Sequence, residues 1–319
     1  MRKVLITGSL GQIGSELMER LRKDLGVDNV IATDVHEPAE GHVAHEGRFE
    51  LLDVTDYDRY LQIAKENDVD TIMHLASLLS ATAEERPQFA WNLNMGGLMN
   101  GLEVARELGE GTKFFTASSI AAFGPSSPQD NTPQDTIMRP TTMYGVTKVA
   151  GELLCDYYHS KYNIDTRGVR FPGLISYKQE PGGGTTDYAV DIYYEALKHG
   201  RYTSYIGEGA YMDMMYMDDA IDAIVDLMTV DPSKLEHRNA FNITAMSFAP
   251  EEIAASIQKY MPDFVMDYNV DPVRQGIADS WPNSLDCSAA KKEWGFDPQF
   301  DLDKMTQEML TQLKHKLDL

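Results

Sequence analysis

Short apolar runs recur along the first half of the chain and alternate with longer segments of helical periodicity. The runs cover residues 3–7, 29–34, 49–54, 71–76, 114–119 and 165–174. Leu17 and Leu21 show the helical spacing after the first run, and residues 87–108 form another predicted helix. Short buried strands alternating with helices are typical of parallel sheets covered on both faces. The pattern therefore predicts an α/β fold with a doubly wound parallel sheet.

A glycine-rich turn joins the first predicted strand to the first predicted helix. Gly8, Gly11 and Gly14 have the spacing Gly-x-x-Gly-x-x-Gly, with Gln12 and Ile13 between the last two. This differs from the Gly-x-Gly-x-x-Gly pattern of many dinucleotide sites. Glycines allow backbone N–H groups to approach a pyrophosphate at the positive end of a helix. A turn without a ligand is the alternative, but the strand and helix context favours a dinucleotide site.

Acidic residues follow the second and third apolar runs. Asp34 stands 20 residues after Gly14 (34 minus 14), where a carboxylate can accept hydrogen bonds from the adenosine ribose. Its charge disfavours the additional phosphate of NADP, so we expect NAD as the cofactor. Asp53, next to Val54, is a second candidate near the adenine, although an Asp at a strand end is commonly a turn or N-cap residue.

A tyrosine and a lysine are four residues apart at the start of another predicted helix. This spacing places Tyr144 and Lys148 on one helix face, where the cation favours the ionised form of the phenol. Most such pairs belong only to a solvated face, so the spacing alone is weak. Ser119 ends the fifth apolar run, 25 residues before Tyr144 (144 minus 119). We expect it at the same carboxyl edge of the sheet, where parallel sheets bind ligands.

The fourth apolar run leads into small residues that suit contact with a cofactor. Leu75, Ala76 and Ser77 are predicted to lie beneath it at the carboxyl edge of the sheet. His74, with apolar neighbours, is predicted to be a hydrogen-bonded core histidine instead of a catalyst. Asn94 is one of several polar or small residues in the 87–108 helix that ordinary helix packing does not require, and it is a further cofactor candidate.

Composition excludes several classes of function. The 319 residues carry 28 Lys and Arg against 50 Asp and Glu, a formal net charge of −22, which repels nucleic acids and anionic membranes. No apolar run approaches the ~20 residues that span a bilayer, and the first residues do not resemble a signal peptide, so we expect a cytoplasmic protein. Cys155 and Cys287 form no CxxC motif, and we expect free thiols, no disulfide and no metal site.

Taken together, the glycine spacing, Ser119 and the Tyr144-x-x-x-Lys148 pair resemble the extended short-chain dehydrogenase/reductase family over essentially the whole chain. The resemblance implies a Rossmann domain over residues 1–172 that binds NAD and carries the catalytic pair. Residues 173–319 would mainly bind the substrate, with some segments returning to the first domain. In this family the helix after the catalytic tyrosine forms a dimer interface. Its wide apolar stripe here implies a homodimer: Val146, Val149, Ala150, Leu153, Leu154, Tyr157 and Tyr158.

The C-terminal half narrows the resemblance to short-chain-type L-threonine 3-dehydrogenases. The match rests on Arg-Phe-Pro-Gly-Leu-Ile-Ser at 170–176 and Pro-Gly-Gly-Gly-Thr-Thr-Asp-Tyr-Ala-Val at 181–190, supported by 214–220 and Ser-Trp-Pro at 280–282. The glycine loop is read as a lid whose N–H groups and Thr hydroxyls hold a small carboxylate; an exposed loop is the alternative. Leu174 is a candidate cofactor contact. The substrate candidates are Ser80, Ser119, Tyr144, Gly184, Thr185, Thr186 and Trp281.

The implied reaction is oxidation of the side-chain alcohol of L-threonine by NAD, giving 2-amino-3-oxobutyrate, a step of threonine catabolism. Tyr144 would act as general base, Lys148 would assist it and bind the nicotinamide ribose, and Ser119 would orient the substrate hydroxyl. Two alternatives remain open. One is a nucleotide-sugar epimerase or dehydratase of the same family, which needs basic groups such as Arg201, Arg238 or Arg274. The other is a non-catalytic dinucleotide sensor.

Overall fold

The computed structural model describes residues 1–178, 180 and 184–319, which form two compact units. The first unit comprises Met1–Ala122, Thr142–Arg170 and Ile221–Phe241. The second comprises Phe123–Thr141, Phe171–Ala220 and Asn242–Leu319. The chain thus contributes three separate segments to each unit.

The first unit is built on a sheet of seven strands in the order β10-β6-β5-β4-β1-β2-β3. β1 pairs in parallel with both β2 and β4, and the same direction continues through β3 and β5. The predicted doubly wound parallel sheet is confirmed. The strands are β1 (Val4–Thr7), β2 (Val30–Asp34), β3 (Phe49–Leu51), β4 (Thr71–His74), β5 (Lys113–Ser119), β6 (Asp165–Phe171) and β10 (Phe241–Asn242).

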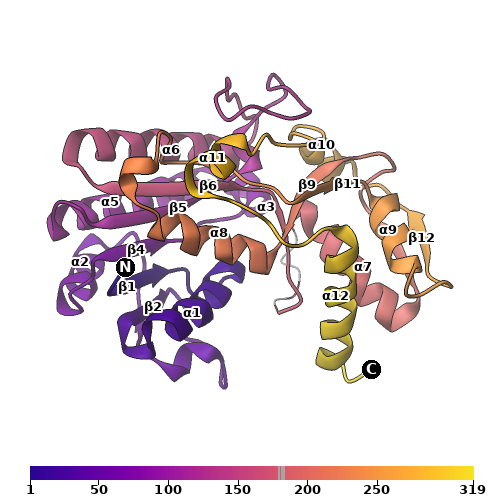
Figure 1. Cartoon of the computed structure of the whole chain (residues 1–319), viewed down its shortest axis with the longest axis horizontal. Helices are drawn as coiled ribbons and strands as arrows, with labels where there is room; N and C mark the ends of the chain where they lie inside the picture. Colours follow the sequence, from indigo (N-terminus) through magenta and orange to yellow (C-terminus); the bar gives the residue numbers. More distant parts are fainter. Residues whose placement is uncertain (179, 181–183) are drawn as a thin grey trace. The chain divides into compact units, whose positions relative to one another are not determined.

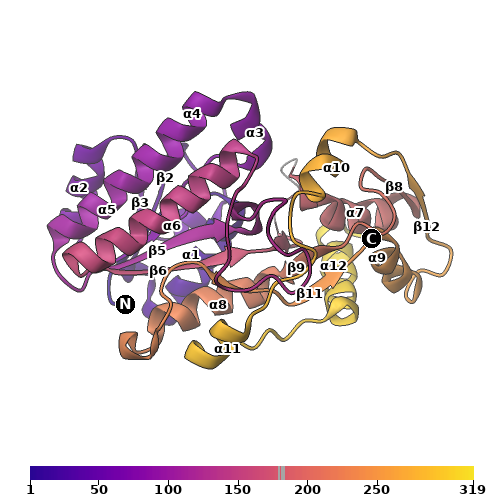
Figure 2. The ribbon, with the colours of Figure 1, turned by 90° about the horizontal axis from the view of Figure 1, so that it is seen from above.

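Helices cover both faces of this sheet (Figure 1, Figure 2). α2, α5 and α6 lie on one face, where Leu5, Ile72 and Phe114 from the strands share a buried core with Leu102 and Tyr158 from the helices. α1 and α8 lie on the other face and are joined by an ion pair between Arg20 and Asp222. The helices are α1 (Gln12–Leu25), α2 (Tyr57–Glu66), α3 (Ser80–Glu85), α4 (Pro87–Trp91), α5 (Gly97–Leu108), α6 (Met143–Tyr162) and α8 (Met217–Thr229).

The helix predicted over residues 87–108 is interrupted by a π-helical segment. α4 and α5 are joined by Asn92–Gly96, whose hydrogen-bonding pattern is wider than that of an α-helix. The segment contains Asn94 and adjoins Gly97, which are unusual residues for an ordinary packed helix. The structure explains Gly97, since a Cβ there would lie 2.6 Å from the Val54 side chain, and only glycine fits. The unusual composition thus accompanies an unusual backbone.

The apolar run at 165–174 forms two strands that belong to different sheets. β6 ends at Phe171 in the seven-stranded sheet, and β7 (Gly173–Ile175) pairs in parallel with β9 (Met212–Tyr216) in the second unit. Pro172 separates them. Because proline has no N–H group, it cannot continue a ladder of backbone hydrogen bonds.

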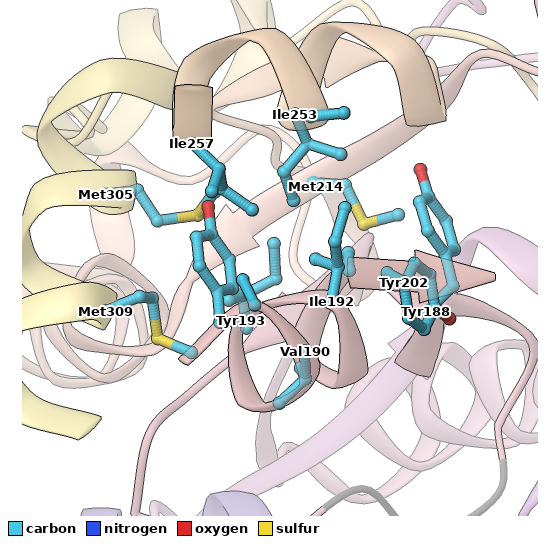
Figure 3. Close-up of a cluster of buried hydrophobic side chains, with 14 of the residues drawn as sticks. Tyr188, Val190, Ile192, Tyr193, Tyr202, Met214, Ile253, Ile257, Met305 and Met309 are labelled. Carbon is cyan, nitrogen blue, oxygen red and sulfur yellow. The ribbon is translucent and has the colours of Figure 1, made fainter. Parts of the chain in front are cut away.

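The second unit packs helices around two small sheets. β9 lies between β7 and β11, and β8 pairs in parallel with β12. Its core is rich in tyrosine and methionine, as Figure 3 shows for Tyr188 and Tyr193 of α7, Met214 of β9 and Met305 of α12. The remaining elements are α7 (Tyr188–His199), β8 (Arg201–Ser204), β11 (Met246–Phe248), α9 (Pro250–Gln258), β12 (Val265–Tyr268), α10 (Pro272–Ala278), α11 (Ser288–Trp294) and α12 (Leu302–Lys316).

Three further findings concern the cysteines, the length of the helices and possible metal ligands. Cys155 and Cys287 are both buried and free, as predicted. No helix within residues 1–178 or 184–319 combines the length and the apolar character needed to cross a membrane. The same residues contain no group of three or more His, Cys, Asp and Glu side chains arranged to hold a metal ion.

Candidate active site

The glycine loop between β1 and α1 forms a tight backbone cradle. Gly8 has φ +67°, in the left-handed region that favours glycine, and a Cβ at Gly14 would lie 2.2 Å from the Gly8 carbonyl oxygen. No side chain caps the N-terminus of α1, so its positive end is open to an anion. The Ser9 hydroxyl is buried without a hydrogen-bond partner among the described residues. These features fit the pyrophosphate of a dinucleotide cofactor.

Asp34 is fixed beside this loop at the carboxyl end of β2. Its Oδ2 accepts a hydrogen bond from the Leu10 N–H at 3.1 Å, and its Oδ1 accepts one from the Val35 N–H at 2.8 Å. A carboxylate has about four lone-pair sites, so acceptor capacity remains for a ribose diol. Asp53 is exposed, and its Oδ1 accepts from the N–H and hydroxyl of Thr55, which gives it a turn role; its contact with adenine stays a prediction.

Tyr144 and Lys148 occupy the first turns of α6. The Thr142 hydroxyl caps this helix by accepting a hydrogen bond from the Gly145 N–H at 3.1 Å. The Lys148 Nζ lies 5.0 Å from the centroid of the Tyr144 ring. It also donates to the Ala117 carbonyl oxygen at 2.8 Å and to the Ser77 hydroxyl at 3.3 Å. The ammonium group is therefore held beside the phenol by contacts with β5 and with the segment after β4.

Ser119 is the last residue of β5 in the same unit. Its hydroxyl oxygen accepts a hydrogen bond from the Ala121 N–H at 3.2 Å, which leaves the hydroxyl hydrogen for another acceptor. The structure thus places Ser119, Tyr144 and Lys148 in one compact unit with the glycine loop. Such a set can remove a proton from an alcohol while a bound cofactor accepts a hydride.

Asn94 connects two parts of the site through its side chain. Its Oδ1 accepts from the Leu78 N–H at 2.7 Å, and its Nδ2 donates to the Thr147 hydroxyl at 3.2 Å. Thr147 in turn donates to the Tyr144 carbonyl oxygen at 2.8 Å. Asn94 is buried, and it ties the segment that contains Leu75, Ala76 and Ser77 to α6. Positioning of this segment is the role that the geometry supports for Asn94.

A buried ion pair behind Lys148 was not predicted from the sequence. Glu152 Oε1 and Oε2 accept from Arg170 Nε at 3.1 Å and Nη2 at 2.9 Å, and both side chains are 6 % exposed. The Ser118 hydroxyl donates to Glu152 Oε1 at 2.5 Å. These bonds join α6, β5 and β6 directly beside the catalytic candidates. The only sequence indication was that Glu152 lies one helical turn beyond Lys148.

His74 is a hydrogen-bonded core histidine, as predicted. Its Nδ1 lies 3.3 Å from the Thr7 hydroxyl and 3.4 Å from the Tyr60 hydroxyl, and its ring stacks between Tyr60 and Phe114. Burial, and to a smaller extent the charge of Lys148, lower the pKa of His74 to about 3. The ring is therefore neutral at physiological pH.

The predicted substrate residues are divided between the units. Ser80, the first residue of α3, belongs to the first unit; Gly184, Thr185, Thr186 and Trp281 belong to the second. Residues 181–183 of the glycine loop lie outside the described residues. The Gly184 N–H donates to Asp187 Oδ2 at 2.7 Å, so this donor is engaged within the chain. Leu174 is in β7, and Trp281 and Thr185 are buried. The substrate roles of these residues stay predictions.

The predicted stripe on α6 is partly exposed. Val146, Leu153 and Tyr157 are 39 %, 63 % and 49 % exposed, whereas Tyr158 is buried. Val146, Leu153 and Tyr157 follow one another at intervals of seven and four residues, which places them on one side of the helix. This side of α6 is an apolar surface; the other side carries Lys148 and Glu152 toward the site.

Comparison with known proteins assigns the family. The model of the NAD dependent epimerase/dehydratase family matches residues 4–244, so the chain belongs to this extended short-chain dehydrogenase/reductase family, and NAD is its cofactor. An uncharacterised epimerase/dehydratase of Staphylococcus saprophyticus is 61% identical over 99% of this chain and 98% of its own.

The names of two similar solved structures state a specific enzymatic activity, which the name of the staphylococcal relative does not. L-threonine dehydrogenase from Clostridium difficile is 68% identical, with a TM-score of 0.97, and the match covers 99% of this chain and 98% of that one. A monomeric L-threonine 3-dehydrogenase from a metagenome is 43% identical, with a TM-score of 0.93, over 98% of this chain and 99% of that one. The recognised likeness to the threonine dehydrogenases is thereby confirmed.

Proposed function

We propose that this protein oxidises L-threonine at its side-chain hydroxyl, with NAD as oxidant, to give 2-amino-3-oxobutyrate. The observation that carries the reaction type is the fixed position of the Lys148 ammonium beside the Tyr144 ring, in one unit with Ser119 and the glycine loop. The choice of threonine is supported by the 68% identity with L-threonine dehydrogenase from Clostridium difficile. On this proposal the first unit binds NAD and the second mainly binds the substrate.

Each residue of the candidate triad has a separate task. Bound NAD supplies the acceptor for the hydride that leaves the alcohol carbon. Tyr144, as phenolate, takes the hydroxyl proton, and Lys148 stabilises the phenolate through its charge. Lys148 also binds the ribose next to the nicotinamide. Ser119 has a hydroxyl hydrogen that is not used by its bond with Ala121, so it donates to the substrate oxygen and orients it.

The charged end of the amino acid requires additional polar groups. We assign this task to Ser80, Gly184, Thr185 and Thr186, and assign to Trp281 the exclusion of water. The Gly184 carbonyl oxygen accepts from the Tyr205 hydroxyl at 3.3 Å, and its N–H is bonded to Asp187. This residue therefore acts by fixing the two threonines that follow it, whose hydroxyls are the donors to the carboxylate.

The alternative of a nucleotide-sugar epimerase is supported by the name of the Staphylococcus saprophyticus relative. Such a substrate needs cationic side chains for its pyrophosphate. Arg201, Arg238 and Arg274 instead face carboxylates of their own units: Asp267 at 3.3 Å, Asp165 at 2.8 Å and Asp271 at 3.9 Å. With a net charge of −22, the chain is better suited to a small zwitterion than to a sugar nucleotide.

Formation of NADH tests the proposal directly. The protein is mixed with NAD and, in separate assays, with L-threonine, L-allo-threonine, L-serine and UDP-sugars, while the absorbance of NADH is followed. We expect threonine to give the largest kcat/KM. Turnover of a UDP-sugar without net NADH would support the epimerase, and binding of NAD without turnover of any substrate would support the sensor.

We further propose a homodimer through the exposed side of α6 and a location in the cytoplasm. The support is the apolar surface formed by Val146, Leu153 and Tyr157. A related structure is described as monomeric, so the oligomeric state of this chain has to be measured. Size-exclusion chromatography with light scattering is expected to give about 71 kDa, twice the mass of the 35.7 kDa chain. Leu153→Asp is expected to give monomers, and a monomeric wild type would refute the dimer.

A further inference from the structure

A small polar cavity lies behind Lys148 within the first unit. Its volume is about 30 Å³. A water molecule needs roughly 10–15 Å³ of such space, so the cavity can hold one or two waters. Its polar wall includes side chains from β4, β5, α6 and the π-helical segment, among them His74, Asn94, Ser118, Thr147, Lys148 and Glu152. Candidate cofactor contacts such as Ala76 and Ser77 line one side of it, but the reaction assigned above gives no task to His74 and Glu152 in the same wall.

The tautomer of His74 follows from the contacts of Thr7. The Leu75 and Ala76 N–H groups donate to the Thr7 hydroxyl oxygen at 3.2 and 3.3 Å, so these neighbours offer it only donors. The hydroxyl hydrogens of Thr7 and Tyr60 are then left for Nδ1 of His74, which lies 3.3 Å and 3.4 Å from the two oxygens, so Nδ1 is an acceptor. A neutral imidazole that accepts at Nδ1 carries its hydrogen on Nε2.

The Nε2 atom of His74 is buried without a hydrogen-bond partner among the described residues. Buried N–H groups nearly always have an acceptor, because leaving one unpaired is unfavourable. Glu152 has spare acceptor capacity across the cavity, since its carboxylate uses three of about four lone-pair sites on Ser118 and Arg170. Lys148 uses two of its three N–H bonds on Ser77 and Ala117.

We propose that a buried water molecule occupies this cavity, accepts a hydrogen bond from Nε2 of His74 and bonds Lys148, so that His74 is a positioning residue for the dehydrogenase. The water has hydrogens to donate, and the Glu152 carboxylate is an acceptor in the same wall. His74 thus fixes the direction of the Lys148 ammonium through the water, and the Ala117 carbonyl oxygen fixes it through a second N–H bond. The third N–H bond, which Ser77 accepts at 3.3 Å, is the one that turns to the ribose when NAD binds. This role in catalysis rests on the proposed function; the water and the tautomer do not.

The charged and titratable groups around the cavity are His74 of β4, Tyr144, Lys148 and Glu152 of α6, and Arg170 of β6. Glu152 and Arg170 form an ion pair, so their charges largely cancel. His74 is neutral because burial lowers its pKa to about 3. A change at His74 therefore acts on the pH dependence of activity only through the position of Lys148.

The tautomer can be measured without any substrate. Two-bond ¹H–¹⁵N NMR spectra of the full-length protein labelled at its 8 histidines distinguish Nε2–H from Nδ1–H rings, and His74→Gln identifies the signal of His74. We expect an Nε2–H ring that does not titrate between pH 5 and 9. In the double variant Thr7→Val, Tyr60→Phe, which lacks both hydroxyls near Nδ1, we expect a mixture of tautomers. A wild-type Nδ1–H ring, or one that titrates in this range, would overturn the proposal.

The role in positioning is tested with two variants that lose the ring and its bond with Thr7 equally. His74→Gln keeps an N–H donor that reaches the cavity, and His74→Leu does not. On the acid limb of the pH profile of kcat/KM, we expect His74→Gln to stay close to wild type. For His74→Leu we expect a shift of about one unit to higher pH, which is about a tenfold loss of activity at a fixed pH on that limb.

Equal acid limbs in the two variants would show that His74 has only a structural role and would overturn the positioning part. If His74→Leu does not fold, a shifted limb in His74→Gln, despite its donor, would overturn it in the same way. If no alcohol is oxidised even by the wild type, the proposed function fails, while the NMR result still decides the tautomer. A crystal structure of the wild type that shows no water between His74 and Lys148 would refute the water site.

Discussion

The two units differ in how many hydrogen bonds the buried polar side chains described here make. In the first unit, Lys148, Asn94 and Glu152 each have two or more hydrogen bonds, and these bonds link β5, α6 and the segment after β4. In the second unit, Asp213 and the hydroxyls of Tyr188 and Tyr202 are buried and make no hydrogen bond of normal geometry among the described residues.

Two unpaired polar atoms of the first unit stand beside the proposed cofactor loop and the proposed water site. The Ser9 hydroxyl belongs to the glycine loop, and Nε2 of His74 borders the cavity behind Lys148. Those of Tyr188 and Tyr202 belong to the hydrophobic core of the second unit (Figure 3). The unpaired atoms of Ser9 and His74 thus have a proposed functional role, whereas those of Tyr188 and Tyr202 are a cost of building a core from large amphipathic side chains.

The sharpest test of the first unit is the loss of its base. Tyr144→Phe removes only the phenolic oxygen, and we expect kcat to fall by roughly 10²–10⁴-fold, the range typical of general acid–base catalysis. Steady-state kinetics with threonine measures the loss. Calorimetric titration with NAD serves as the control and is expected to give a nearly unchanged Kd. Activity within threefold of wild type would refute Tyr144 as the base.

Breaking the buried ion pair behind the site is expected to lower the stability of the first unit. Glu152→Gln leaves the Arg170 guanidinium buried without its counterion, and we expect the free energy of unfolding to fall by about 3 kcal/mol. Urea denaturation measures this. The double variant Glu152→Gln, Arg170→Met removes both charges and is expected to recover most of the loss. A loss below about 1 kcal/mol in the single variant would contradict the pairing.

Asp213 gives the second unit a pH dependence of its own. Burial raises the pKa of Asp213 to about 8, against the smaller opposing effects of Thr244 and the Leu285 backbone. The folded state then holds a proton that the unfolded chain releases near pH 4. The free energy of unfolding contributed by this group is therefore fully present below about pH 4 and is lost as pH rises toward 8.

The expected slope from Asp213 is at most ~1.4 kcal/mol per pH unit. Urea titrations at pH 5 and pH 8 should show that Asp213→Asn loses less stability between these values than the wild type does. Asp267→Asn, at an exposed position of β12, is the control and should leave the difference unchanged. Equal losses in the wild type and Asp213→Asn would mean that this carboxyl is ionised in the folded protein.

The smallest effect is expected from the loss of one protein hydroxyl that is proposed to bind the substrate. Thr186→Ala should raise KM for threonine about fivefold, equivalent to ~1 kcal/mol for one hydrogen bond, and leave the Kd of NAD unchanged. Thr186→Ser keeps the hydroxyl and should remain close to wild type. If both variants raise KM equally, the binding of threonine depends on the methyl group of Thr186, which approaches Gly173, and not on its hydroxyl.

The features that the sequence predicts best are those that depend only on residues close together in the chain. The β1–glycine loop–α1 unit depends on a short apolar run, three glycines and helical periodicity, all within residues 3–25. The approach of Lys148 to Tyr144 depends on one turn of α6. Both arrangements could be predicted from the spacing of nearby residues. The order in which they follow one another along the chain was predicted from the family resemblance.

Contacts between distant parts of the chain could not be predicted in the same way. Glu152 lies on a helix and Arg170 on a strand, and the sequence pattern of neither element indicates that the two side chains form a pair. His74 and Thr7 are in contact although 67 positions separate them in the sequence. The division of the 165–174 run at Pro172 into two sheets depends on partners that the run itself does not reveal. The burial of Asp213 was missed for a similar reason, since a single acid in a short strand gives no indication of which face is covered.

The close approach of α1 to Gly8 has a consequence for evolution and for how such sequences are read. A side chain at Gly14 would collide with the Gly8 carbonyl even before any cofactor binds, so the glycine belongs to the folding requirements of the bare polypeptide. A descendant that abandoned redox chemistry would remain under selection to keep it. The glycine spacing thus indicates a shared fold, whereas the catalysis proposed here depends on Tyr144, Lys148 and Ser119, for which no comparable packing constraint is found.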